Sequence, residues 1–137
     1  MKRYMKNIIK GSGVLACLLV CSLASYAYNV KFAFSLTSGW LSSWGYSDYA
    51  YKYSANESPV VTCTYTEGSS DYFTYTVRNS NNDDRVTPFS TSGTFDTRAF
   101  SDNQTAQNYK YKLGVQRGTG AWNTSARCDG LWNVDSY

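Results

Sequence analysis

Apolar and polar side chains alternate every second residue through most of the chain after residue 27, and this pattern constrains the fold more than any other feature. It occurs in six segments, 30–36, 49–53, 61–66, 73–78, 109–115 and 122–134. Successive side chains of a β-strand point to opposite faces of the sheet, so this alternation is typical of strands with one buried face. The sequence therefore predicts an all-β protein.

Polar and glycine-rich segments separate these strands. The turn Glu67–Ser70 predicts an antiparallel hairpin between 61–66 and 73–78, and Arg117–Gly120 predicts a second turn. Thr94–Phe100 is expected to add one more strand. Short strands with frequent turns indicate an antiparallel β-sandwich or small barrel of about seven or eight strands. Residues 28–137 fit a single domain of this kind.

Residues 1–27 resemble a secretory signal peptide. The basic residues Lys2, Arg3, Lys6 and Lys10 precede an apolar run from Gly13 to Ala24, and Ser25 and Ala27 are the small residues before a cleavage site. Cleavage after Ala27 would give a secreted, extracellular domain. A lipidated Cys17, after a lipobox-like Val14–Ala16, is the minor alternative. The apolar run is too short to span a membrane, and the mature chain is predicted to lack a transmembrane segment.

Net charge argues against nucleic acid as a partner. The chain has thirteen Lys and Arg and ten Asp and Glu, and four of the basic residues precede Ala27. Nine basic and ten acidic side chains then remain, a net charge of −1. A neutral surface without a basic run does not neutralise phosphates, so no nucleic-acid binding is predicted.

Two cysteines remain after the signal, Cys63 and Cys128, and both lie on the apolar side of their strands. In an exported chain they are predicted to form one disulfide. It would close a loop of about 65 residues and contribute about 4 kcal/mol in the chain-entropy model. A metal site would need further soft ligands, and the chain has no histidine. No metal or cofactor is therefore predicted.

The absence of histidine also excludes catalytic Ser-His-Asp and Cys-His arrangements. Paired carboxylates, as in glycoside hydrolysis, are the remaining route, and a glycan-acting enzyme is the minor alternative to a non-enzymatic protein. The separated candidates are Asp48, Glu57, Glu67, Asp71, Asp96, Asp102, Asp129 and Asp135. Asn79, Asn81 and Asp83 have the spacing of calcium ligands, but Asp84 and Ser90 break the pattern, which favours a solvated loop.

Aromatic residues are abundant: four Trp, six Phe and eleven of the thirteen Tyr lie after residue 27. Trp40, Trp44 and Tyr46 fall in a Gly- and Ser-rich segment that is predicted to be a loop. Exposed rings on a β-scaffold can stack on sugars, so these three residues are the predicted ligand-binding site; a loop that plugs the open end of the sheets is the alternative. The stripe Tyr49, Tyr51 and Tyr53 is predicted to form the edge of the core rather than an exposed platform.

Two resemblances follow from these features. The strand 29–35 directly after a signal, the Tyr- and Thr-rich segments, and the closing run 130–135 resemble a family of small exported Gram-positive bacterial proteins of unknown function. The overall plan, an export signal followed by an aromatic-rich β-domain, is similar to that of lactococcin-type secreted bacteriocins. Neither resemblance supplies a catalytic residue.

The function that these observations favour is a secreted, non-enzymatic binding module whose partner is a cell-envelope component, such as a cell-wall glycan or its precursor. A bacteriocin-like or membrane-active toxin is the alternative.

Overall fold

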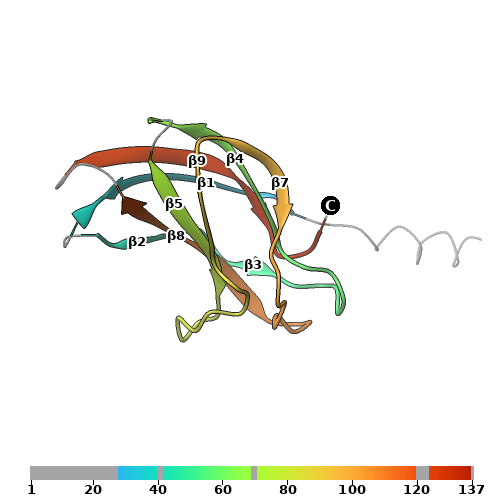
Figure 1. Ribbon diagram of the computed structural model, residues 1–137. Helices are drawn as coiled ribbons and strands as arrows, with labels where there is room; N and C mark the ends of the chain where they lie inside the picture. Colours follow the sequence, from blue (N-terminus) through green and yellow to red (C-terminus); the bar gives the residue numbers. More distant parts are fainter. Residues whose placement is uncertain (1–27, 40–41, 69–70, 120–123, 137) are drawn as a thin grey trace, which may run out of the picture.

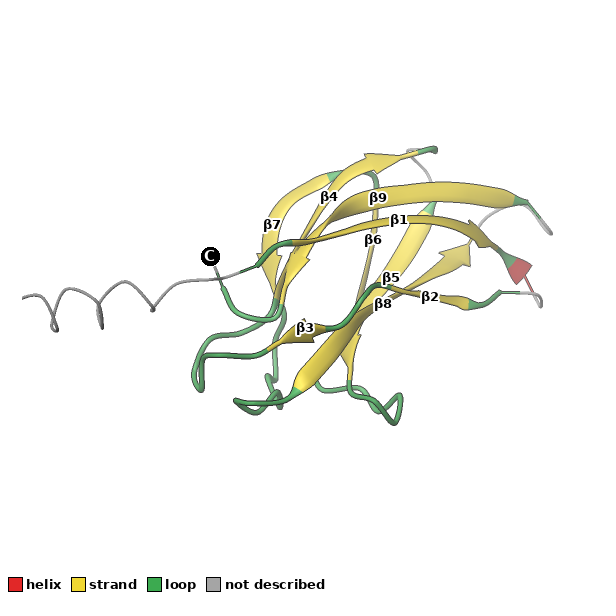
Figure 2. Cartoon of the chain, turned by 180° about the vertical axis from the view of Figure 1, so that it is seen from behind, coloured by secondary structure: helices red, strands yellow, loops and turns green. Residues whose placement is uncertain are grey.

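The computed structural model describes residues 28–39, 42–68, 71–119 and 124–136. The predicted signal peptide lies outside them. The described residues contain nine strands and no α-helix. Strands make up most of the domain in Figure 2, and the short red segment after β1 is a single 3₁₀ turn at Gly39. The strands are β1 (Val30–Thr37), β2 (Trp44–Tyr46), β3 (Ala50–Tyr51), β4 (Val60–Thr66), β5 (Tyr72–Arg78), β6 (Phe89–Ser92), β7 (Phe95–Ala99), β8 (Lys110–Thr119) and β9 (Ser125–Asn133). The all-β prediction is confirmed.

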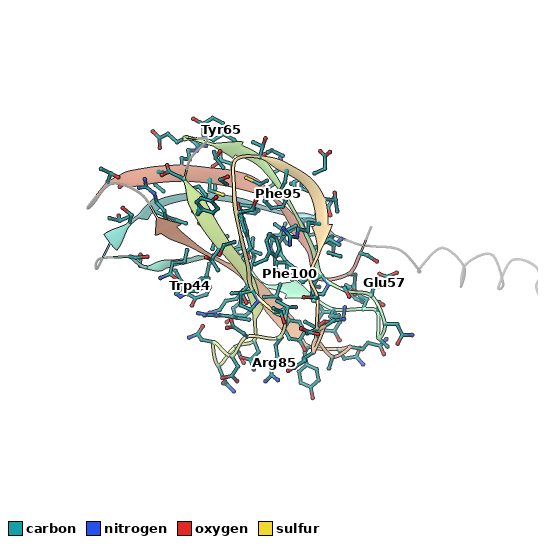
Figure 3. The ribbon with its side chains drawn as sticks, viewed as in Figure 1. Trp44, Glu57, Tyr65, Arg85, Phe95 and Phe100 are labelled. Carbon is teal, nitrogen blue, oxygen red and sulfur yellow. The ribbon has the colours of Figure 1, made fainter. Side chains whose placement is uncertain are left out.

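The strands form two antiparallel sheets, drawn one above the other in Figure 1. The first has the order β1-β9-β4-β7, and the second has β2-β8-β5-β6 with β3 also paired to β8. The apolar sides of both sheets share one core, because alternate residues of each strand point inward. Phe73, Tyr75, Leu113 and Trp132 are fully buried in this core. Figure 3 shows Phe95 and Phe100 between the sheets.

The chain crosses between the sheets at most of its connections. Among the described strands, β5 and β6 are the consecutive pair that hydrogen-bond to each other. The predicted hairpin between 61–66 and 73–78 is wrong, because β4 pairs with β9 and β7 while β5 pairs with β6 and β8. The segment after β4 instead carries the chain from one sheet to the other. Alternation identifies the buried face of a strand but does not identify its neighbours.

Three boundaries also differ from the predictions. β2 lies in the segment predicted to be a loop, and β6, between Pro88 and Gly93, falls where no strand was predicted. Arg117 and Gly118 are not in a turn but continue β8, which runs to Thr119. Each of these segments pairs with a longer strand, so backbone hydrogen bonds outweigh the local turn preference of Gly, Ser and Pro.

A buried ion pair lies near each end of β8. Near its start, Lys52 is fully buried and its Nζ lies 3.1 Å from Asp135 Oδ1. The same Nζ donates to the carbonyl oxygens of Glu57 and Val134. Near the other end, Arg117 Nη2 lies 2.9 Å from Asp71 Oδ1. These pairs replace the solvation that the two cations lose on burial.

Cys63 and Cys128 lie on the neighbouring strands β4 and β9, and both side chains are buried in the core as predicted. The predicted disulfide between them is not present. Their Sγ atoms are 3.8 Å apart, and both residues are free thiols. A disulfide has an S–S distance of about 2.05 Å.

Candidate functional site

Trp44 and Tyr46 lie on the outer face of the second sheet. In register they face Gln116 and Gly114 of β8, whose neighbours Leu113 and Val115 point into the core. Gly114 is the reason that the rings fit there. A Cβ at this position would lie 3.2 Å from each of Trp44 Cε3 and Tyr46 Cε1. The missing side chain therefore lets two partly exposed aromatic rings lie against the sheet.

Arg78 fixes both rings from β5, the strand on the other side of β8. Its guanidinium lies 4.1 Å from the centre of the Trp44 ring, and its Nη1 donates a hydrogen bond of 2.6 Å to the Tyr46 hydroxyl. Arg78 is itself held by Asp84, with 2.7 Å between Nε and Oδ1. A guanidinium over an aromatic face is attracted by the partial negative charge that the ring quadrupole places on that face. The rings are thus held in place before any ligand binds.

Lys112 extends the arrangement along β8. Its Nζ lies 4.1 Å from the centre of the Tyr46 ring and 5.6 Å from that of Tyr49. Aromatic rings and cationic side chains therefore alternate across this face. Together they combine apolar area with positive charge. We call the set Trp44, Tyr46, Arg78 and Lys112 the outer-face site. Figure 3 shows Trp44 beside β2, at a distance from Tyr65 on β4 of the other sheet.

The structure places the predicted site residues unevenly. Trp44 and Tyr46 lie together in the outer-face site, whereas Trp40 lies outside the described residues. Sequence reasoning missed Arg78 and Lys112. Both stand at polar positions of predicted strands, so the sequence predicts that their side chains point outward. It does not predict that β2 pairs with β8, which brings them to Trp44 and Tyr46.

The prediction that the tyrosine stripe forms the edge of the core is wrong. Tyr49, Tyr51 and Tyr53 are 48%, 37% and 60% exposed, and the alternate residues Ala50 and Lys52 are buried instead. The pattern has the period of a strand, but the smaller and the charged residues occupy its inner side. The ion pair of Lys52 makes this possible, since a buried ammonium needs a carboxylate partner.

The two cysteines form a buried cluster with Tyr75, which reaches across from the second sheet. The Tyr75 hydroxyl lies 3.2 Å from Cys128 Sγ. The hydrogen bond with Cys128 lowers the pKa of Cys63 to about 7. The same bond to Cys63, together with burial, raises the pKa of Cys128, and burial and the neighbouring thiols raise the pKa of Tyr75. Cys63 is therefore the thiol of the pair that ionises first.

The carboxylates considered for catalysis are mostly engaged in structural contacts. Asp71, Asp129 and Asp135 form ion pairs with Arg117, Arg127 and Lys52. Glu67 accepts the backbone N–H of Arg127, and Asp102 accepts the hydroxyl of Thr87. Asp48, Glu57 and Asp96 are exposed.

The segment with calcium-like spacing is a turn that its own side chains close. Asn79 Oδ1 accepts the backbone N–H groups of Asn81 and Asp83, and Asn79 Nδ2 donates to the Asp83 carboxylate. These oxygens are used in local hydrogen bonds of the kind that stabilise Asx turns.

A hollow of about 440 Å³ lies on the first sheet, over β1, β9 and β4. Lys31 and Asp129 provide the charge at its rim, and Ala33 and Leu131 line it with apolar surface. It forms beside Thr64, at the irregularity where β4 shifts register against β9.

Comparison of the chain with protein-family models, with curated proteins and with solved structures finds no match. The two resemblances drawn from the sequence thus stay predictions. None of the described residues belongs to a helix that is long and apolar enough to cross a membrane.

Proposed function

We propose that the protein is an exported, non-enzymatic binding module that contacts a glycan of the cell envelope through the outer-face site. The observation that carries this proposal is the placement of Trp44 and Tyr46, which Arg78 holds in position on an outer sheet face. Fixed rings bind with little loss of side-chain entropy, and sugars present apolar C–H faces on which such rings stack. The signal-like residues 1–27 support export.

The test is depletion of the purified protein by isolated Gram-positive cell walls. Trp44→Ala and Tyr46→Ala are each expected to reduce the bound fraction at least tenfold, because each removes a ring from the site. Trp40→Ala is measured alongside them. Tyr65→Ala is the matched control, since Tyr65 is 47% exposed but lies on the other sheet. Thermal unfolding of each variant shows whether the fold is retained.

Two results would reject the proposal. One is unchanged depletion by folded Trp44→Ala and Tyr46→Ala proteins. The other is dye leakage from lipid vesicles without any depletion by walls, which is the behaviour of a membrane-active toxin.

We also propose that the two sheets form a β-sandwich in which Cys63 and Cys128 become a disulfide after export. Their sulfur atoms already face each other in the folded domain. Because both thiols are buried there, the exchange with an oxidoreductase would take place before the core closes. Two protons and two electrons would leave the thiols and reduce the disulfide of an extracytoplasmic thiol–disulfide oxidoreductase.

The intact mass under non-reducing conditions is then expected to be two hydrogen atoms lower than that of the dithiol. Cys63→Ser removes this difference. A dithiol mass in protein recovered from the culture medium contradicts the disulfide but leaves the binding proposal unaffected.

A further inference from the structure

The exposed tyrosines continue the outer-face site along β8. Tyr49, Tyr51 and Tyr53 are exposed, and so is Tyr109, at 64%. The rings of Tyr51 and Tyr53 lie 4.7 Å apart, centre to centre, at an angle of 57°. A cluster of exposed rings of this size is unusual for a surface without a partner.

This part of the surface is rigid because it is built around the buried Lys52. The backbone N–H of Lys52 donates to Tyr109, and its carbonyl accepts from Asn108. The backbone N–H of Tyr53 donates to Asp135 Oδ2 at 2.9 Å. The Tyr51 hydroxyl donates to Asn108 Oδ1 at 3.2 Å. The backbone that carries these tyrosines is therefore tied down, and the Tyr51 ring is also held by its hydroxyl.

The tyrosines and the outer-face site belong to one strip. β2 pairs with Gly114–Gln116 of β8, and β3 pairs with Lys110 and Tyr111 of the same strand. Lys112 lies between them and contacts the rings of both Tyr46 and Tyr49. From Gln116 to Lys110 the strip is about 20 Å long at the usual rise per strand residue. That length suits a chain of sugars rather than one sugar.

The charge of the strip is the second observation. Five of the nine basic side chains after residue 27 form ion pairs with carboxylates. Among the described residues, the other four basic side chains form no ion pair, and two of them are Lys110 and Lys112. Lys110 is exposed and faces Tyr51 in register. Two carboxylates also bear on the charge of the strip. Asp48, between β2 and β3, is exposed, whereas Asp84 forms an ion pair with Arg78.

We infer that this strip binds an acidic polysaccharide, whose sugar rings stack on the tyrosines while its carboxylate or phosphate groups pair with Lys110 and Lys112. The inference rests on the proposed function and adds the charge and the extent of the ligand. Lysines without carboxylate partners provide the complementary charge, and the aromatic rings provide contact area that is insensitive to salt.

Two polymers with the same backbone test the charge. The protein, purified after expression of the full chain, is titrated with carboxymethyl-cellulose and with neutral hydroxyethyl-cellulose at low salt. Binding to the carboxylated polymer is expected to be at least tenfold tighter, and the difference should shrink as salt is raised. Vesicles that contain phosphatidylglycerol form a third arm, since they present anionic charge without sugar rings.

Variants then separate the two contributions. The double variant Lys110→Met/Lys112→Met is expected to bind both polymers equally, with Lys31→Met, an exposed lysine of the other sheet, as the control. Tyr51→Ser/Tyr53→Ser is expected to weaken binding to both polymers at least fivefold, with Tyr65→Ser as the control. These side chains are exposed except for the partly buried Lys112, and thermal unfolding verifies that each variant is folded.

Several results overturn the inference. They are equal binding of the two polymers by the parent protein, binding of neither polymer, an unchanged preference in the double lysine variant, and binding to the vesicles alone. If any of these occurs while cell walls still deplete the protein in a Trp44-dependent way, the proposed function stands and only the acidic chain is rejected. If Trp44→Ala leaves depletion by walls unchanged, the proposed function fails.

Discussion

Gly114 is the residue on which the geometry of the outer-face site depends. We expect Gly114→Ala to lower the free energy of unfolding by about 1–2 kcal/mol, because its methyl group would lie 3.2 Å from both rings and from Thr76 Cγ2. It should also change the fluorescence of Trp44 and weaken binding to cell walls. Chemical denaturation and fluorescence spectra measure these effects.

Gly118 provides the control on the same face of the same strand. A Cβ there would meet its nearest atom, the carbonyl oxygen of Tyr72, at 3.7 Å, which is ordinary contact. Gly118→Ala should therefore be neutral or slightly stabilising. Equal effects of the two substitutions would mean that the rings do not depend on the space at Gly114.

The cysteine cluster gives the reduced protein a characteristic dependence on pH. The pKa of Cys63 falls from 9.0 to about 7 on folding, so the unfolded chain holds more protons between these values and stability should rise from pH 7 to 9. The pKa values of Cys128 and Tyr75 are raised on folding, from 9.0 and 10.0, so stability should fall above pH 9. A maximum near pH 9 is expected.

Denaturation in the presence of a reductant measures this profile. In Cys63→Ala the rise between pH 7 and 9 should disappear. A parent protein whose stability falls steadily from pH 7 would contradict the assignment of Cys63 as the group with the lowered pKa.

At the scale of elements, the ion pair of Lys52 and Asp135 joins the β3 segment to the residues after β9. Lys52→Met leaves the Asp135 carboxylate, which is 6% exposed, without its cation. We expect a loss of about 3–5 kcal/mol in the free energy of unfolding, measured by urea denaturation. Replacement of both partners by Met and Leu should recover part of this loss, because no unpaired charge is then buried.

The surface pair Arg85 and Asp83 is the control for this prediction. Its side chains are 36% and 60% exposed and its atoms are 3.5 Å apart. Arg85→Met should cost less than about 1 kcal/mol. A similar loss for Lys52→Met would show that water reaches the buried pair.

Gly130 controls the packing of β9 against β4. A Cβ there would lie 2.0 Å from the carbonyl oxygen of Thr62 and 2.6 Å from Phe32 Cζ. Because a backbone atom is the obstacle, Gly130→Ala should cost about 3 kcal/mol or more in the free energy of unfolding. Urea denaturation should give a much lower midpoint than for Gly118→Ala, and equal midpoints would contradict this packing.

The sequence predicts the elements better than their partners. The long strands β1, β4, β5, β8 and β9 follow from their alternation, because burial of one face repeats every second residue. The short strands β2 and β6 do not, since few of their residues reach the core and pairing with a neighbour determines them. The sequence also does not predict that the Lys52 side chain points inward, because its partner Asp135 lies 83 residues away.

For the whole molecule, the sequence predicts an all-β protein with one core but not its topology. The connection after β4 has turn-forming residues that suit a hairpin and a crossing equally well. Of the candidate site, the sequence singles out Trp44 and Tyr46 by their Gly- and Ser-rich setting. Arg78, Lys112 and the exposed tyrosines join them only once it is known which strands adjoin β8. Strand pairing depends on residues that are distant in sequence, and a local pattern does not contain that information.

The position of β9 has a consequence for when the chain can fold. The first sheet is built around β9, which lies between β1 and β4 although it is the ninth described strand in chain order. Neither neighbour can complete its ladder until β9 is available. Since closing such long loops precedes the gain from pairing, folding of the first sheet should be slow. Until β9 joins them, the facing edges of β1 and β4 stay unpaired.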